Sequence, residues 1–182
     1  MYRTLDIPFV MKWITRENVH VDRVACPWLI RRFVDPIAEF IFVPAEDVDR
    51  IARESQAIPF DTPEAELGHR EERCSFDAII EKYHLKDQAL LDLAAIVRAA
   101  DTDAFHLAPE SVGLEAIAAG ATMIAKDDAE TIEKSMFLYD SLYANCELRL
   151  LREKYKAELE KMSRGERRDF LKRKLSEKAR NK

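Results

Sequence analysis

Short alternating and apolar segments in the first third of the chain predict a small β-sheet. Residues 12–16 alternate between polar and apolar side chains, which is the period of a half-buried strand. Residues 40–43 form an apolar run that stops at Pro44, and residues 58–60 form a third extended segment. With only 4 glycines and 7 prolines in 182 residues, the chain has too few turn signals for an all-β fold.

Apolar residues at helical spacing dominate the remaining sequence. Pro27 precedes such a pattern, and proline is favoured as the first residue of a helix, so we expect a helix over 27–34 with Cys26 as its N-cap. A start at Asp22 is the alternative. Further helices are predicted over 46–55, 75–83, 88–100 and 109–119, from residue 128, and over 165–178. The prediction is an α+β fold, predominantly α-helical, with a small β-sheet and a long C-terminal helix.

The helix predicted from residue 128 carries an apolar stripe whose members are separated alternately by four and three residues. This spacing is typical of a seam that packs on a neighbouring helix. The neighbour is either a helix of the same chain or the same helix of a second chain, so a homodimer through this helix remains open. The stripe consists of Ile132, Met136, Tyr139, Tyr143, Cys146 and Leu150.

Charge divides the chain into an acidic body and a basic tail. The segment from Glu147 to Lys182 contains 14 Lys and Arg and 7 Asp and Glu, which gives it a net charge of +7. The net charge of the whole chain is −5, so residues 1–146 carry a net charge of −12. An acidic body argues against a nucleic-acid-binding domain, although the tail alone could contact an acidic partner.

The cellular location and the state of the cysteines follow from simpler features. No apolar run approaches the about 20 residues of a membrane span, and residues 1–10 are too polar for a secretory signal. We therefore expect a cytoplasmic protein without a membrane partner. Cys26, Cys74 and Cys146 are odd in number and far apart, so free thiols are expected.

The densest group of chemically useful residues lies between His20 and Arg32. At a helix N-terminus, Cys26 would be stabilised as a thiolate, with Arg23 adding positive charge, and could then act as a nucleophile or reductant. Arg31 is a candidate anion-binding residue, because its guanidinium presents a planar fork to oxyanions. Asp22 and Arg23 are further candidate ligand-binding residues in this segment. The structural alternatives are a buried capping cysteine and ordinary ion pairs.

Two later segments add possible metal ligands. His69, Cys74 and Asp77 fall within nine residues, although their spacing matches no standard zinc motif. Arg98 and Asp101 lie three residues apart at the end of a nearly all-apolar helix, where they form either part of a site or an ion pair that orients the helix.

Four blocks of the sequence resemble the C-terminal domain of the ChrB chromate-resistance family. The most specific block is WITRENVHVDRVACPWLIRRFVD, from Trp13 to Asp35. The other blocks are His69 with CSFDA at 74–78, IVRAADTD at 96–103 and LYDSLYANC at 138–146. The resemblance divides the chain into a ChrB-like domain, residues 1–147, and a basic helical extension, residues 148–182.

The resemblance implies a bacterial protein associated with chromate resistance, in which separated polar residues form one site. Longer members carry an additional N-terminal domain and are described as chromate-responsive regulators. Some relatives have a histidine at the position of Arg98, so a metal site here would lose one ligand and an anion site would gain a cation. The residues implied in the site are Asp22, Arg23, Cys26, His69, Cys74, Asp77 and Asp101.

Three functions are compatible with these residues. The first is a sensing or regulatory domain that binds an inorganic ligand, either a divalent metal (zinc, manganese or iron) or an oxyanion such as chromate, with His69, Cys74, Asp77 and Asp101 as metal ligands. The second is a redox or hydrolytic enzyme that uses Cys26 or Cys74 as a thiolate, or a metal-bound water, in detoxification of chromate or reactive oxygen. The third is a non-catalytic interaction module that uses the long helix and the tail.

Overall fold

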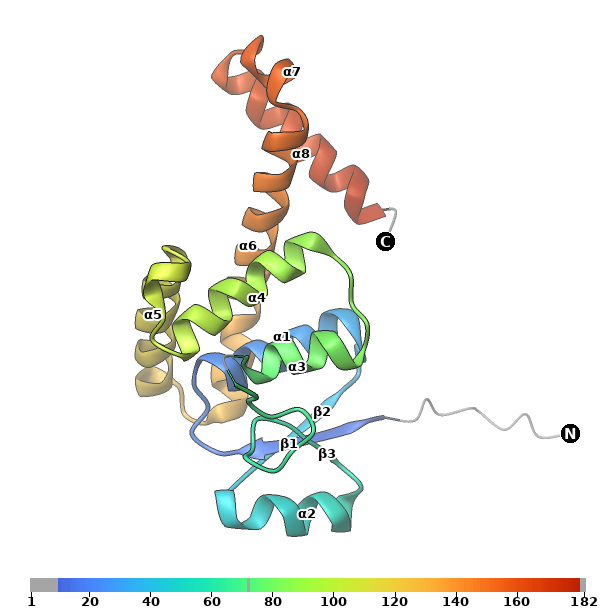
Figure 1. Cartoon of the computed structure of the whole chain (residues 1–182), viewed down its shortest axis with the longest axis vertical. Coiled ribbons are helices and arrows are strands. Elements are labelled where there is room, and N and C mark those ends of the chain that lie inside the picture. The colour runs from blue at the N-terminus through green and yellow to red at the C-terminus, as the bar shows by residue number, and fades with distance from the viewer. Residues whose placement is uncertain (1–9, 72, 181–182) are drawn as a thin grey trace, which may run out of the picture.

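The chain folds into a helical body with a small sheet at one end and a helical tail at the other (Figure 1). The computed structural model describes residues 10–71 and 73–180, so residues 1–9, in which we expect no secretory signal, lie outside it. The predominantly helical α+β class and the long C-terminal helix are confirmed. No helix in the described ranges combines the length and the apolar character that crossing a membrane requires.

The sheet has three parallel strands in the order β2-β1-β3. They are β1 (Lys12–Arg16), β2 (Glu39–Val43) and β3 (Ile58–Pro59), which confirms the predicted strands. The first crossover is helix α1 (Val21–Phe33), and the second contains the short helix η1 (Ala45–Asp47) and α2 (Val48–Ser55). Because parallel strands run in one direction, their carboxyl ends all meet at one edge of the sheet.

Both faces of the central strand are covered. Successive side chains of a strand point to opposite faces, and Trp13 and Ile14 accordingly belong to different apolar clusters. Ile14 packs with Val48 and Ala52 of α2, whereas Trp13 joins the main core that α1 and the later helices form. The sheet therefore lies between α2 and the rest of the body, as Figure 1 shows.

The predicted start of the first helix at Pro27 is wrong, whereas the alternative at Asp22 lies one residue from the observed start. Helix α1 begins at Val21 rather than at Pro27, and its N-cap is His20, so Cys26 lies in the second turn and not at the helix N-terminus. The proline is inside the helix. An apolar pattern at helical spacing already begins before the proline, through Val21, Val24, Ala25, Trp28 and Leu29, all of which are buried.

The later helices agree with the predicted order and build the core above the sheet. Helix α4 is buried along most of its length, as its apolar sequence predicts. The helix predicted over 109–119 continues to Ile124. The elements are α3 (Ser75–Lys82), α4 (Gln88–Asp101), the short helix η2 (Phe105–Leu107), α5 (Glu110–Ile124) and α6 (Asp128–Lys154).

The apolar stripe of α6 packs inside its own chain. Ile132, Tyr139 and Cys146 are buried in the main core, and the Tyr139 hydroxyl donates a hydrogen bond to the Val21 carbonyl at 3.0 Å. The ring of Tyr139 also lies 6.2 Å from that of Trp28. The stripe therefore joins α6 to α1 and α4 of the same molecule.

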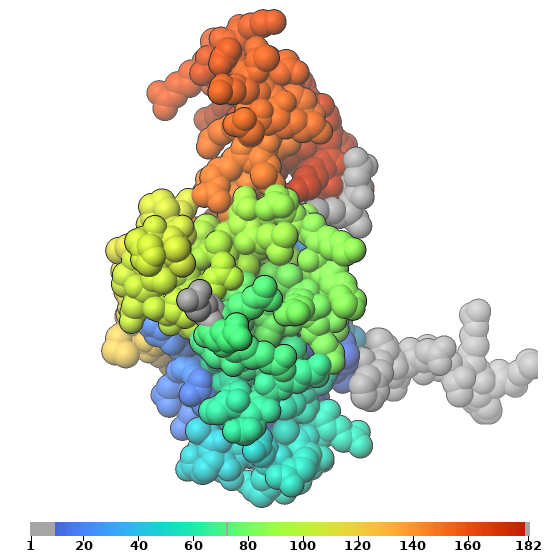
Figure 2. Space-filling model, viewed as in Figure 1, coloured from blue at the N-terminus to red at the C-terminus, as the bar shows by residue number. Residues whose placement is uncertain are grey.

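The tail stands apart from the body and folds back on α6 (Figure 2). It contains the short helix α7 (Lys156–Glu160) and helix α8 (Arg164–Arg180). Tyr155 and Phe170 form an edge-on aromatic pair with ring centroids 5.2 Å apart, and Lys178 forms an ion pair with Glu147 at 2.9 Å. The predicted domain boundary at residue 148 lies within α6, so the body and the tail share one continuous helix.

Candidate metal centre

A group of charged side chains gathers at the carboxyl edge of the parallel sheet. Arg16 ends β1, Asp61 follows β3 by two residues, and Asp22 lies in the first turn of α1, which follows β1. In open parallel sheets this edge is the usual position of ligand sites, because the connecting loops converge there. The topology therefore brings together residues that are up to 79 positions apart, as in the contact of Asp22 with Asp101.

Asp22 is the most enclosed member of the group, with 1% of its surface exposed. Its two carboxylate oxygens accept hydrogen bonds from the backbone N–H groups of Ser75 at 2.7 Å and Phe76 at 3.1 Å. These N–H groups belong to the first turn of α3, where they have no partner within the helix and the helix dipole favours a negative charge. Asp22 thus connects the N-terminus of α1 to the N-terminus of α3.

His69 lies among three carboxylates. Its Nε2 atom is 3.4 Å from Oδ2 of Asp22, 3.1 Å from Oδ1 of Asp61 and 3.2 Å from Oδ2 of Asp101. The hydrogen bond with Asp22, together with the charges of the three carboxylates, raises the pKa of His69 to about 9. At neutral pH the metal-free chain therefore holds an imidazolium between carboxylates. The imidazole remains 44% exposed, so solvent reaches the group from this side.

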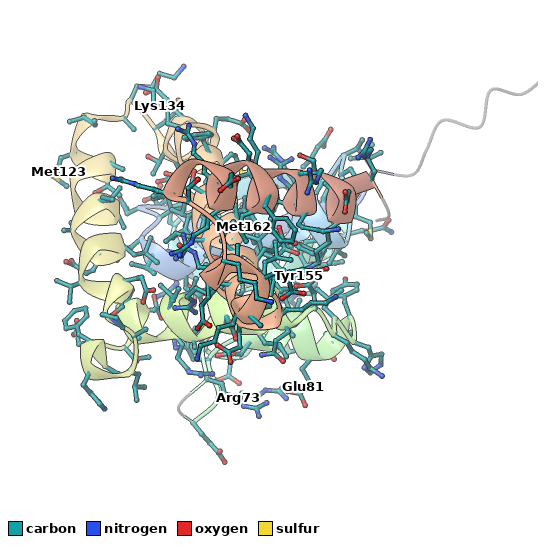
Figure 3. All side chains as sticks on the ribbon, turned by 90° about the horizontal axis from the view of Figure 1, so that it is seen from above. Arg73, Glu81, Met123, Lys134, Tyr155 and Met162 are labelled. Carbon is teal, nitrogen blue, oxygen red and sulfur yellow. The ribbon has the colours of Figure 1, made fainter. Side chains whose placement is uncertain are left out.

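The backbone of the loop that carries His69 approaches itself closely. A Cβ atom at Gly68 would lie 2.4 Å from the carbonyl oxygen of Thr62, which is closer than any side-chain carbon can come. Only glycine allows this contact, and the residue that follows is His69. At the end of the loop, Arg73 forms an exposed ion pair at 3.1 Å with Glu81 of α3 (Figure 3).

Asp61 connects the group to two arginines. Its Oδ2 atom lies 3.1 Å from Arg16 and 3.3 Å from Arg23, and its Oδ1 accepts a hydrogen bond from the hydroxyl of Ser75 at 3.1 Å. Burial and the neighbouring Asp22 raise the pKa of Asp61, while the two arginines oppose this shift. Asp61 is thus held in place and partly neutralised.

The other two carboxylates lack comparable compensation. Within residues 10–71 and 73–180, neither Asp22 nor Asp101 has a Lys or Arg within ion-pair distance, and His69 is their shared basic partner. Asp101 ends α4 and accepts a hydrogen bond from the backbone N–H of Asp22 at 3.3 Å. Burial and the charge of Asp22 raise the pKa of Asp101 to about 6. Asp22 and Asp101 therefore share the single positive charge of His69, although Arg16 and Arg23 beside Asp61 bring the charge of the whole group to zero while His69 is protonated.

The donor set is suited to a divalent cation. Asp22, His69 and Asp101 each offer one ligand atom, and these atoms lie within 4.8 Å of one another. Carboxylate and imidazole donors bind metals at about 2.0–2.2 Å, which places the donors of one ion within roughly 4.4 Å of each other. Small side-chain movements would therefore let these three residues bind one ion, with Asp61 beside them as a third oxygen donor.

The two cysteines near the group are buried thiols. Burial, followed by the charge of Asp22, raises the pKa of Cys26, whose Sγ donates to Oδ1 of Asp22 at 3.2 Å. Cys74 is the N-cap of α3, at the start of the helix predicted over 75–83. Burial and the charges of Asp22 and Asp77 raise the pKa of Cys74 as well. The thiolates that helix N-termini were expected to stabilise are disfavoured at both positions.

The remaining predicted residues lie outside the group around His69. Asp77 accepts from the backbone N–H of Cys74 in a capping box and pairs with Arg98 at 3.0 Å, so the expected pair of Arg98 with Asp101 does not form. Arg31 forms an ion pair with Glu133 of α6, and its guanidinium lies 5.1 Å from the centre of the Phe40 ring. The structure thus brings together Asp22, Arg23, Cys26, His69, Cys74 and Asp101, places Asp77 and Arg98 next to them, and leaves Arg31 elsewhere.

The sequence analysis did not identify Asp61 or Arg16 as site residues. Asp61 directly follows the extended segment over residues 58–60, and Arg16 is the last residue of the strand predicted over 12–16. Their common signal is position, because both come at or directly after the carboxyl end of a parallel strand. Without knowing that the strands are parallel, this signal could not be used.

Known proteins are similar to the part of the chain that contains Asp22, His69 and Asp101. The family model described as "ChrB, C-terminal domain" matches residues 13–146. Protein ChrB of Cupriavidus metallidurans is 36% identical over 135 residues, which cover 74% of this chain and 40% of that protein. No solved structure matches significantly. The chain spans less than half the length of this relative, and it belongs to the ChrB family through the C-terminal domain.

Proposed function

We propose that the chain is a metal-binding domain with a sensing or regulatory role in chromate resistance, and that Asp22, His69 and Asp101 bind one divalent cation. The observation that carries this proposal is the convergence of these three donors, two of which are carboxylates without an arginine or lysine partner in the described structure. A divalent cation there would place two positive charges beside these carboxylates, in place of the single proton of His69. The link to chromate resistance rests on membership of the ChrB family.

The donor types favour manganese or iron over zinc. Carboxylate-rich sites suit hard ions such as Mn²⁺, and a single imidazole is compatible with Fe²⁺, whereas structural zinc sites are commonly built from thiolates. The buried, protonated state of Cys26 and Cys74 argues against thiolate ligation. We therefore expect Cys26→Ala and Cys74→Ala to retain metal binding.

An oxyanion is a poorer ligand for this group. Chromate carries negative charge and would face the carboxylates of Asp22, Asp61 and Asp101. The arginines that could attract it are already engaged, since Arg16 and Arg23 pair with Asp61. The charge of the site therefore selects for a cation.

The protein's own residues would couple occupancy to the shape of the domain. Asp22 joins α1 to α3, Asp101 ends α4, and His69 belongs to the loop between β3 and α3. When His69 loses its proton and a cation binds, bonds to the cation would connect α1, α4 and the His69 loop in place of the present hydrogen bonds and ion pairs. A ligand that binds only the folded state, at a free concentration of 100 times its Kd, stabilises that state by about 2.7 kcal/mol. The accompanying change in the position of the His69 loop is what a regulatory partner could recognise.

The test is metal binding by the purified full chain. Calorimetric titration with Mn²⁺, Fe²⁺ under anaerobic conditions, and Zn²⁺ should give one site per chain, with Mn²⁺ or Fe²⁺ bound more tightly than Zn²⁺ after correction for intrinsic metal affinities. His69→Ala should abolish binding, whereas His106→Ala, an exposed histidine after α4, should leave it unchanged. Unaltered binding in His69→Ala, or a thermal shift with chromate but with none of the metals, would refute the proposal.

A metal-dependent redox enzyme is the second candidate, because the partly exposed face at His69 would let a small oxidant reach a bound ion. The metal would supply the redox change or the activated water. Catalytic dismutation of superoxide, or catalytic reduction of chromate with an added electron donor such as ascorbate, by the metal-loaded chain would favour the enzyme, provided that it is abolished in His69→Ala and kept in Cys26→Ala. Metal binding without turnover would favour the sensor.

A further inference from the structure

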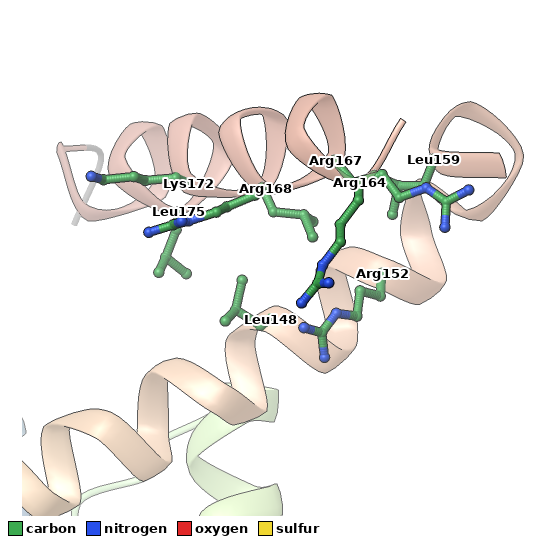
Figure 4. A pocket seen from close by; sticks show the side chains of 9 residues that line it. Leu148, Arg152, Leu159, Arg164, Arg167, Arg168, Lys172 and Leu175 are labelled. Carbon is green, nitrogen blue, oxygen red and sulfur yellow. The ribbon is translucent and has the colours of Figure 1, made fainter. Parts of the chain in front are cut away.

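The tail contains a groove between α6 and α8 that the metal centre does not involve. Its apolar floor consists of Leu148 from α6, Leu159 from α7, and Leu171 and Leu175 from α8. Figure 4 shows Leu148 and Leu175 pointing toward each other across the gap. The groove has a volume of about 550 Å³, which is in the range of ligand-binding cavities. Leu159 and Leu171 are buried at the bottom of the groove, whereas Leu148 and Leu175 are half-buried and remain partly uncovered.

Basic side chains surround this floor. They are Arg152, Arg164, Arg167, Arg168 and Lys172, and all five residues are exposed. Arg167 donates to the backbone carbonyls of Met162 and Glu160. Among the ion pairs of the described residues none involves these five, although most of the other arginines in the molecule are paired. The groove is thus an apolar surface with uncompensated positive charge.

The distribution of this charge indicates the shape of the occupant. The lining residues of α8, from Arg164 to Leu175, follow one face of the helix over about 16 Å at 1.5 Å per residue. A small amphiphile with one anionic head would need cations only at one end. Cations at residues 164, 167, 168 and 172 instead suit an occupant with negative charges along about two helical turns.

The apolar floor excludes the simplest polyanion. Single-stranded nucleic acids bind through phosphate contacts and base stacking on aromatic rings, but the residues that line the groove include no aromatic side chain. A helix with leucine-type residues on one face would instead place those residues against the four leucines, as in helix-in-groove recognition. Glutamates or aspartates beside that face would meet the basic rim.

We infer that the groove between α6 and α8 binds an acidic amphipathic helix of a partner protein, with Leu148, Leu171 and Leu175 contacting its apolar face and Arg164, Arg168 and Lys172 its carboxylates. The interaction would complete a three-helix arrangement at the tail. It is independent of the metal centre, so the two sites can be tested separately.

The test uses the full chain and a labelled synthetic helix of about four turns, with leucines at i, i+3, i+4 and i+7 and glutamates at the flanking positions. Fluorescence anisotropy should show saturable binding, and a peptide of the same composition with scattered leucines should bind at least about tenfold more weakly. Arg168→Glu with Lys172→Glu should weaken binding of the designed helix by about tenfold or more. Lys156→Glu with Lys161→Glu makes the same change in charge outside the groove and should have little effect.

Two results would overturn the inference. Equal affinity for the designed and scattered peptides would mean that charge alone is recognised. Self-association of the wild-type chain in sedimentation that disappears in Arg168→Glu with Lys172→Glu would assign the groove to a second copy of the chain. Circular dichroism of each variant, with an unchanged helical signal, ensures that lost binding does not reflect loss of α8. Leu175→Gln provides an independent test of the floor, because it should weaken binding without changing the charge.

Discussion

The metal centre and the tail groove use charge in opposite ways. At the metal centre, three carboxylates surround one imidazole, and backbone N–H groups of α1 and α3 fix the positions of Asp101 and Asp22. In the groove, five basic side chains lie in solvent, and few of them have a fixed partner. A buried charge needs a partner inside the fold, whereas an exposed charge is solvated by water and can remain unpaired until another molecule binds. Changes at the first site should therefore affect folding and binding together, and changes at the second should affect binding alone.

The largest effect is expected for Asp22→Ala. The substitution leaves the N–H groups of Ser75 and Phe76 buried without their acceptor, which should lower the free energy of unfolding by about 3 kcal/mol. Metal binding should be lost as well. Chemical denaturation measures the first effect, and Asp49→Ala, at an exposed position in the first turn of α2, should change stability by less than about 0.5 kcal/mol. Similar stabilities for the two variants would contradict the role of Asp22 as a structural anchor.

Gly68→Ala should have the next largest effect. The new methyl group meets the carbonyl of Thr62, so the loop must move, at a cost of about 1–3 kcal/mol, and it should carry His69 away from the carboxylates. We expect metal affinity to fall about tenfold or more in titration calorimetry.

Gly113→Ala in α5 is the matched control. A Cβ atom there meets no other atom within 4 Å, and alanine favours helix by up to about 1 kcal/mol, so this variant should be slightly stabilised and bind metal normally. If Gly68→Ala behaved like Gly113→Ala, the close approach in the loop would not matter for the site.

The stability of the metal-free chain should fall as pH rises through the titration of His69. The folded-state pKa of about 9 is above the ordinary 6.5, so the stabilisation is complete below about pH 6.5 and is lost as pH approaches 9. The raised pKa of Asp101 acts in the same direction at lower pH, between 3.8 and about 6. For the half-exposed imidazole the contribution is on the order of 1 kcal/mol after allowance for solvent screening.

Thermal unfolding in a chelator between pH 6 and 9 measures this loss, and His69→Gln should flatten the curve. Metal affinity should change in the opposite direction, because the imidazole must lose its proton to bind an ion. A metal-free stability that rises over this interval in the wild type would contradict the contacts of His69.

The smallest effects are expected where the two regions should be independent. Arg168→Glu with Lys172→Glu should leave the Kd for Mn²⁺ within about twofold, because the groove lies in the tail and exposed charges are screened over about 8–10 Å. Arg31→Gln should also retain metal binding, since Arg31 pairs with Glu133 away from His69. A large loss of metal affinity in either protein would mean that the regions are coupled.

The sequence predicted the elements better than it predicted their ends and directions. The strands, α4 and the packing stripe of α6 follow from apolar periodicity, which survives in the structure because these residues form the core. The start of α1 was missed because proline usually marks a first helical turn, whereas here Pro27 lies inside a helix that tertiary packing maintains.

The site residues were predictable in part, and for a different reason. His69 and Asp101 were candidates within their own segments, but their grouping with Asp22 came from the resemblance to the ChrB family, because no local spacing joins residues so far apart. Asp61 and Arg16 become visible only when the strands are known to be parallel. The expected thiolate at Cys26 depended on a helix N-terminus that lies five residues earlier, next to Asp22.

The central claim is that Asp22, His69 and Asp101 form one cation site, and Asp101→Asn tests it most directly. This variant keeps the shape of the side chain and removes one ligand charge, and Asp103→Asn, two residues later and exposed, is its control. Titration with Mn²⁺ should give one site per chain in the wild type and in Asp103→Asn, and an affinity at least about tenfold lower in Asp101→Asn. Equal affinity in all three proteins, or no binding to the wild type, would contradict the account.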